Sequence, residues 1–174
     1  MIKKKSPVKT FLKIAAVVIA VIFVFAIISS MTHDSDDMQG STLNEEAISK
    51  VRDFSPAGAD GITYGEAYAD FYGDPEWSQF MSEDNESVVE FAGECTYKDK
   101  EGNAYLQFTL DDEGNIDSYY GQFKYKGKKK KVDIDSDILK DLFFQPIVDY
   151  AKDTKGKELT DDQVTELYSN ITTE

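Results

Sequence analysis

The chain begins with a basic segment that leads directly into an unbroken apolar run. Fifteen apolar residues occupy positions 14–28, and five lysines come before them: Lys3, Lys4, Lys5, Lys9 and Lys13. A helix of that length rises about 22 Å, whereas a hydrocarbon core is about 30 Å thick. The flanking residues make up the difference, because the ammonium group of Lys13 can reach the head groups. The sequence therefore predicts one transmembrane helix over residues 11–31.

The orientation of this helix follows from where the lysines lie. All five precede the apolar run, so the positive-inside rule places a basic tail, residues 1–10, in the cytoplasm and the remaining chain outside the cell. A cleaved signal peptide has a similar basic start, but it needs small residues at its cleavage site. Ile28-Ser29-Ser30 fits that requirement poorly. We therefore expect a single-pass protein of the cell membrane, with a secreted domain after cleavage as the alternative.

The part of the chain beyond residue 31 is strongly acidic. It carries 14 basic and 33 acidic residues, a formal charge of −19. Such a surface repels nucleic acids and anionic lipids and suits cations or basic partners, although acidity also simply keeps an exported domain soluble. A single cysteine, Cys95, excludes an internal disulfide, so the fold must depend on its core or pair Cys95 between chains.

Periodicity divides this outer part into three segments. Residues 32–41 lack apolar periodicity and are interpreted as a flexible acidic stalk. A capping box at Thr42 then predicts a helix ending near Phe54, and a second one, Thr63 with Glu66, predicts a helix over residues 64–72. Gly73 is expected to end that helix in the left-handed conformation. The α+β domain is predicted to cover residues 42–132, with a helical extension over 133–174.

Alternating apolar residues predict an antiparallel meander after these helices. A short strand is expected around Trp77 to Met81, and longer strands at 88–97, 104–110 and 116–126. Turns are expected at Lys100-Glu101-Gly102-Asn103 and Asp111-Asp112-Glu113-Gly114-Asn115, and Lys128 to Val132 is expected to add a short edge strand.

The C-terminal extension is helical by pattern. Asp135 or Ser136 caps a predicted helix that Pro146 kinks or divides, and a Thr160 with Gln163 capping box begins a last helix. Both helices have apolar faces that we expect to pack on the sheet. The fold class expected for the chain is therefore α+β, with one transmembrane helix, an N-terminal helix, an antiparallel three- to four-stranded meander and C-terminal helices.

Four segments in the outer part resemble a known protein family. They are Thr63-Tyr64-Gly65-Glu66-Ala67, Pro75-Glu76-Trp77 and Val88-Val89-Glu90-Phe91-Ala92-Gly93-Glu94-Cys95-Thr96-Tyr97, followed by Leu106-Gln107-Phe108-Thr109. Together they resemble an uncharacterised family of membrane-anchored extracytoplasmic domains from clostridia and related Gram-positive bacteria. The resemblance covers roughly residues 43–125 and implies no activity or site residue. At the level of fold alone, the order of elements also resembles outer-membrane assembly lipoproteins and β-lactamase inhibitor proteins, which implies protein binding.

Nothing in the sequence forms a catalytic or cofactor-binding constellation. The lone histidine, His33, lies in the expected stalk, and Cys95 lies on an inward strand face, where a buried thiol is inert. Asp133, Asp135 and Asp137 begin like a calcium loop, but position 6 is Ile138 and position 12 is Phe144. We expect no enzyme activity, no catalytic or metal-binding residue and no cofactor.

The one local feature with functional potential is a lysine cluster on this acidic domain: Lys124, Lys126, Lys128, Lys129, Lys130 and Lys131. One interpretation is a patch that binds an anionic partner such as a cell-wall polymer, a lipid surface or an acidic protein. The preferred interpretation is an edge strand that lysines protect from pairing.

The function expected from the sequence is that of a non-catalytic, membrane-anchored extracytoplasmic binding module. Its partner is expected to be another envelope protein or a cell-wall polymer, and not a nucleic acid. A structural spacer and an accessory subunit of an envelope complex are the alternatives. The sequence gives no oligomeric state.

Overall fold

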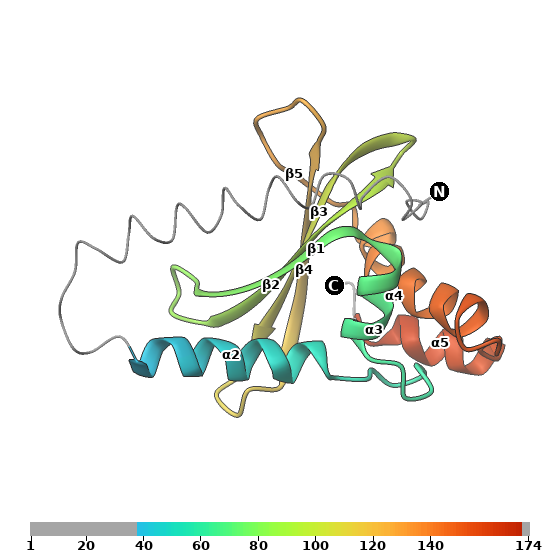
Figure 1. The fold of residues 1–174 in the computed structure, drawn as a ribbon, viewed down its shortest axis with the longest axis horizontal. Coiled ribbons are helices and arrows are strands. Elements are labelled where there is room, and N and C mark those ends of the chain that lie inside the picture. The colour runs from blue at the N-terminus through green and yellow to red at the C-terminus, as the bar shows by residue number, and fades with distance from the viewer. Residues whose placement is uncertain (1–37, 172–174) are drawn as a thin grey trace. The chain divides into compact units, whose positions relative to one another are not determined.

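The computed structural model of the protein describes residues 38–171 (Figure 1). The predicted basic tail, the predicted transmembrane helix at 11–31 and stalk residues 32–37 lie outside the described residues. Among helices of the described part, none is long and apolar enough to cross a membrane.

Residues 44–171 form one compact α+β unit. Its helices are α2 (Met38–Arg52), which begins before the unit, α3 (Tyr64–Phe71), α4 (Ser136–Asp153) and α5 (Asp161–Ser169). Its strands are β1 (Gly73–Met81), β2 (Ser87–Tyr97), β3 (Lys100–Leu110), β4 (Ile116–Tyr125) and β5 (Val132–Asp133). The predicted α+β class and the antiparallel meander are confirmed, but the sheet has five strands instead of the three to four expected, because the segment from Gly73 to Met81 and the short pair Val132-Asp133 both join it.

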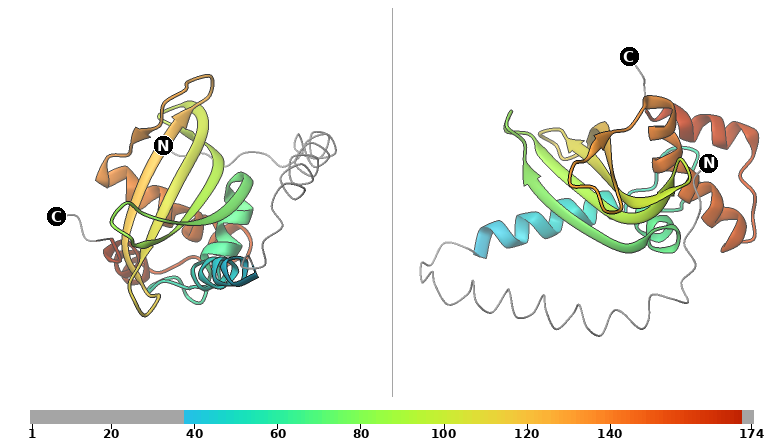
Figure 2. Two further views of the ribbon diagram at one scale, coloured as in Figure 1. Left: turned by 90° about the vertical axis from the view of Figure 1, so that its left-hand side faces the viewer. Right: turned by 90° about the horizontal axis from the view of Figure 1, so that it is seen from above.

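The five strands form one sheet in chain order, β1-β2-β3-β4-β5, with every neighbouring pair antiparallel. Successive side chains alternate between two faces, and the predicted inward set of β2, which includes Phe91 and Cys95, is confirmed as buried. On the other face, which we call the outer face, the side chains remain accessible except for Val88. The left view of Figure 2 looks onto the sheet with α4 and α5 behind it.

The core is an aromatic cluster between the inward face and helices α3 and α4. Phe108 of β3 contacts Tyr64 of α3 and Phe143 of α4, with ring centroids 5.0 and 5.1 Å apart. Tyr68 lies 4.7 Å from Phe91 by ring centroids and stacks on Trp77. Edge and tilted ring contacts of this kind stabilise beyond the area they bury, so this cluster fixes how both helices lie on the sheet.

Two tyrosines of the α3 segment reach the backbone of α4 beside Pro146. The Tyr72 hydroxyl donates to the Leu142 carbonyl at 2.7 Å, and the Tyr68 hydroxyl donates to the Phe143 carbonyl at 3.1 Å. In an α-helix the Leu142 carbonyl would accept from the N–H of residue 146, which proline lacks. The Tyr72 hydroxyl supplies the missing donor, so α4 continues through Pro146 as one helix instead of dividing.

Helix α5 packs mainly on α4 and on the loop after α2. The sequence predicts packing on the sheet instead. The Tyr168 ring lies 5.7 Å from that of Phe144 by centroids, and the Asn170 amide donates to the Ala57 carbonyl at 3.1 Å. A side chain at Gly58, whose φ is +83°, would meet the backbone of Gln163 and Leu167. Glycine therefore permits both the turn and this close approach.

The local start signals of two helices are confirmed. Thr63 with Glu66 and Thr160 with Gln163 form reciprocal capping boxes at the starts of α3 and α5. The Thr42 signal is wrong, because α2 begins at Met38 and runs through four residues assigned to the stalk. Helix formation is cooperative, so a helix that packs against the domain can extend by about one more turn even through weak helix formers such as Gly40 and Ser41.

Three turn assignments differ from the sequence-based expectation. Helix α3 ends with Tyr72 in an extended conformation, and Gly73 opens β1 instead of ending the helix in the left-handed region. The hairpin between β2 and β3 turns at Lys98 and Asp99, with φ of 47° and 59°, two residues earlier than expected. Gly102 lies inside β3, where a side chain would collide with the Phe123 ring.

The donor at Pro146 can be tested by a double-mutant cycle. Tyr72→Phe leaves the buried Leu142 carbonyl without a donor and should lower the free energy of unfolding by about 1–3 kcal/mol. In a Pro146→Ala background the helix supplies its own N–H, so the same change should cost less than half as much. Denaturant unfolding of the wild type, the two single variants and the double variant measures the coupling energy between Tyr72 and Pro146. Tyr125→Phe is the control, and equal costs in both backgrounds would contradict the assignment.

Stability should fall steeply at alkaline pH. Burial raises the pKa values of Tyr64, Tyr68 and Tyr72 well above 10.0. These tyrosines stay protonated in the folded state, while in the unfolded chain they ionise above about pH 10. The contribution of these tyrosines to the free energy of unfolding is therefore fully present below about pH 10. Above that pH the free energy of unfolding should fall by about 4 kcal/mol per pH unit for the three tyrosines together.

Urea unfolding at a series of pH values, with tyrosinate absorbance as a second readout, measures this loss. In Tyr68→Phe the slope should be smaller by about 1.4 kcal/mol per pH unit, while lysine effects stay the same in both proteins. An unchanged slope would show that Tyr68 ionises in the folded protein.

Candidate functional site: the lysine-bearing end of the sheet

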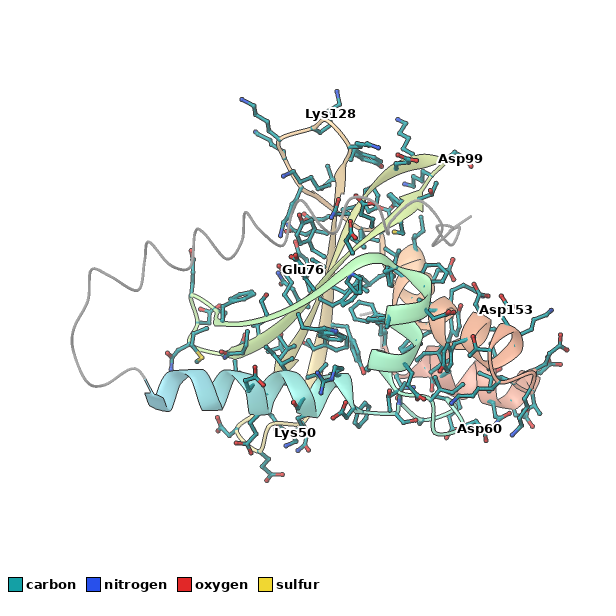
Figure 3. All side chains as sticks on the ribbon, in the orientation of Figure 1. Lys50, Asp60, Glu76, Asp99, Lys128 and Asp153 are labelled. Carbon is teal, nitrogen blue, oxygen red and sulfur yellow. The ribbon has the colours of Figure 1, made fainter. Side chains whose placement is uncertain are left out.

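The predicted lysine cluster lies at one end of the sheet. Lys124 belongs to β4, and the other five lysines lie in the loop between β4 and β5. The expected strand from Lys128 to Val132 is wrong except at Val132, because β5 contains only Val132 and Asp133. Figure 3 shows Lys128 at the tip of this loop, away from the ribbon of the sheet. Lys128–Lys131 therefore lie in a loop and do not themselves form the edge strand that was expected.

Two of the six lysines are held by contacts within the domain. Lys126 pairs with Glu101 at 2.8 Å, which raises the pKa of the lysine. Lys131 lies over the Tyr105 ring, 3.5 Å from its centroid, and its ammonium is 3.5 Å from the Glu90 carboxylate. The Glu90 side chain is only 16% exposed and also accepts from Gln107 at 2.7 Å. Lys131 is thus a structural residue of the outer face.

The remaining lysines are available to a partner. Lys128, Lys129 and Lys130 are exposed and make no ion pair with any side chain that the structure describes. Three adjacent ammonium groups in a six-residue loop repel one another. An anion bound across them would relieve that repulsion as well as gain attraction.

The structure adds two lysines that sequence analysis missed. The register pairs Tyr97 with Lys100 and Gly102 with Tyr125, which brings the turn between β2 and β3 to the same end as the lysine loop. Lys100 lies 5.5 Å from the centre of the Tyr125 ring, and Lys98 pairs with Asp135 at 3.1 Å. Sequence analysis would have included both lysines in this end of the sheet if it had assigned the turn to Lys98 and Asp99 instead of to residues 100–103.

The opposite end of the sheet is acidic. The loop between β1 and β2 and the loop between β3 and β4 meet there, because Ser87 pairs with both Met81 and Leu110. Their carboxylates are Glu83, Asp84, Glu86, Asp111, Asp112 and Glu113. Lysines at one end and carboxylates at the other give the sheet a charge polarity along its strands. An approaching polyanion would therefore meet the lysine end first.

The other candidate groups are engaged structurally. The Asp111 carboxylate accepts the backbone N–H groups of Glu113 and Asn115, which lowers its pKa and confirms a turn. Asp133 accepts hydrogen bonds from Tyr120 and Gln122, and these lower its pKa. Cys95 is 2% exposed in the core. Within residues 38–171 no group of three or more histidine, cysteine or acidic side chains could hold a metal ion.

No protein-family model, no curated protein and no solved structure matches the chain. The resemblance to the clostridial extracytoplasmic family stays a prediction, and the functional argument depends on the geometry of the site.

The structural role of Lys131 gives a stability test within the cluster. Lys131→Ala removes the cation beside the half-buried Glu90 and should lower the free energy of unfolding by about 1–2 kcal/mol. Lys129→Ala, the matched control at the loop tip, should change it by less than about 0.5 kcal/mol. Thermal and urea unfolding measure both. Equal effects of the two substitutions would show that the contact with Glu90 and Tyr105 contributes nothing.

Proposed function

We propose that this protein is a non-catalytic binding module of the cell envelope, held by one N-terminal membrane helix with its acidic domain outside the cell. Its partner is an anionic cell-wall polymer or an envelope protein with an acidic surface. The lysine end of the sheet, formed by Lys98, Lys100, Lys124 and the loop residues 126–130, is its binding surface. A domain that serves only as a spacer is the competing function.

The observation that carries this proposal is the exposed, unpaired lysine triplet at the tip of the β4–β5 loop. In a domain with a large excess of acidic groups, nearby carboxylates could pair with these lysines at little cost. The nearby carboxylates pair with other lysines instead: Glu90 with Lys131, Glu101 with Lys126, and Asp135 with Lys98. The charge of the triplet is thereby left for an external group, which supports binding over spacing.

Removing charge from the triplet should weaken envelope association. In cells that carry the tagged full chain, we expect Lys128→Ser/Lys129→Ser to reduce the crosslinked partner about tenfold, at about 0.3–1 kcal/mol for each lysine. Lys140→Ser/Lys152→Ser on α4 makes the same charge change away from the cluster and should leave recovery unchanged. Quantitative crosslinking and pull-down at two salt concentrations measure both.

Two outcomes would contradict the proposal. Equal recovery from the two variants, with equal salt sensitivity, would exclude the lysine end as the binding surface. Recovery of bulk envelope proteins alone, with no stoichiometric partner, would support the spacer. Protease added to intact cells tests the orientation, because the domain should be cleaved without lysis of the cells.

A further inference from the structure

Strand β1 is a free edge of the sheet whose second half lacks the usual protection. The sheet ends at β1, which pairs with β2 alone. Its first half is shielded by Pro75 and by an irregularity of register between Gly73 and Glu76. The second half, Trp77-Ser78-Gln79-Phe80-Met81, has no charge, no proline and a continuous register with β2. We call residues 77–81 the open edge.

The open edge has the groups needed to accept another strand. An edge strand turns alternate backbone N–H and C=O groups away from its single partner, and these can pair with an extended chain. In the described part of the chain, residues 77–81 have no backbone partner outside the sheet, and the only side chain that reaches this stretch of backbone is Gln79, whose amide lies 3.3 Å from the Phe80 carbonyl. Phe80 and Met81 are 40% and 53% exposed. An added strand would cover apolar surface as well as gain hydrogen bonds.

The charge around the open edge has one sign. Between residues 53 and 97 the chain has 11 carboxylates and no lysine, arginine or histidine. Several of these are neutralised from elsewhere in the fold, as Glu66 is by Lys155 and Asp60 by Lys157. The five that flank the edge, Asp74 and Glu76 at its start and Glu83, Asp84 and Glu86 beyond its end, make no ion pair with residues 38–171.

We propose that the open edge of β1 binds an extended segment of a partner protein by strand addition, and that the segment has a β-forming centre flanked by lysine or arginine. The backbone ladder supplies affinity, while the acidic flanks select basic ends. A second copy of this chain fits less well, because pairing two β1 edges would bring acidic flanks together. This surface is separate from the lysine end and takes a partner of opposite charge.

A peptide probe tests this directly on the full chain in detergent micelles. The probe is the capped peptide Lys-Lys-Val-Thr-Val-Thr-Val-Lys-Lys, whose binding is followed by fluorescence anisotropy and should weaken as salt increases. Peptides with glutamate in place of the lysines, or with proline in place of the central valine, should bind at least tenfold more weakly. Proline removes a ladder donor, and glutamate meets the acidic flanks.

Amino-acid substitutions test whether the peptide binds at the open edge. Ser78→Lys puts a cation on the exposed middle of the open edge and should weaken binding of the basic peptide at least tenfold. Thr165→Lys on the exposed side of α5 adds the same charge and should have no effect. Phe80→Ser should weaken binding about threefold by removing an aromatic cross-strand contact. Urea unfolding checks that the three variants remain folded.

Four results would overturn the proposal. Equal binding of the proline peptide would exclude strand addition, and equal binding of the glutamate peptide would exclude selection by charge. No difference between Ser78→Lys and Thr165→Lys would exclude this edge. A concentration-dependent dimer that Ser78→Lys abolishes, with no peptide binding, would replace the basic segment by a second copy. None of these results bears on the lysine end, so each proposal can fail alone.

Discussion

The hydroxyl groups of Tyr68, in α3, and of Tyr72, directly after α3, donate to the backbone of α4 and hold the two helices together. Pro146 interrupts the hydrogen-bond ladder of α4 in the core, between Phe143 and Ile147, both of which are fully buried. An unpaired carbonyl there would be costly, because water cannot reach it. The hydroxyls of Tyr72 and Tyr68 remove that cost and fix α3 against α4 at one position along its axis.

The same tyrosines connect the helices to the sheet, so one cluster determines the geometry of both layers. The Tyr72 ring lies 5.0 Å from that of Phe91, and a side chain at Gly93 would come within 2.7 Å of the Cβ of Tyr72. Glycine at position 93 therefore lets the segment after α3 approach β2 closely before the chain turns into β1. Every buried polar side-chain atom of the described residues has a hydrogen-bond partner. A core with large rings and satisfied hydroxyls leaves little freedom for another arrangement.

Because the helices occupy the inward face, the two surfaces proposed for binding lie at one end and along one edge of the sheet. The antiparallel meander brings alternate turns together, lysine-bearing at one end and acidic at the other, and leaves β1 with one neighbour. Contacts such as Lys131 on Tyr105 and Glu90 organise the outer face itself. A small domain can in this way present two surfaces of opposite charge, one at an end of the sheet and one along an edge.

The local features of this protein could be predicted from the amino-acid sequence. The capping boxes at Thr63 and Thr160, the inward alternation around Phe91 and the buried state of Cys95 depend on residues close together in the chain, and all are confirmed. Three features could not be predicted, because each depends on a residue distant in the chain: which lysines are unpaired, why α4 continues through Pro146, and where the hairpin between β2 and β3 turns. Lys131 contacts Glu90, the Leu142 carbonyl accepts from Tyr72, and Gly102 lies so close to the Phe123 ring that a side chain there would collide with it. Predictions from hydrophobic periodicity and helix propensity cannot include such contacts, because these methods consider each residue only with its neighbours in the chain.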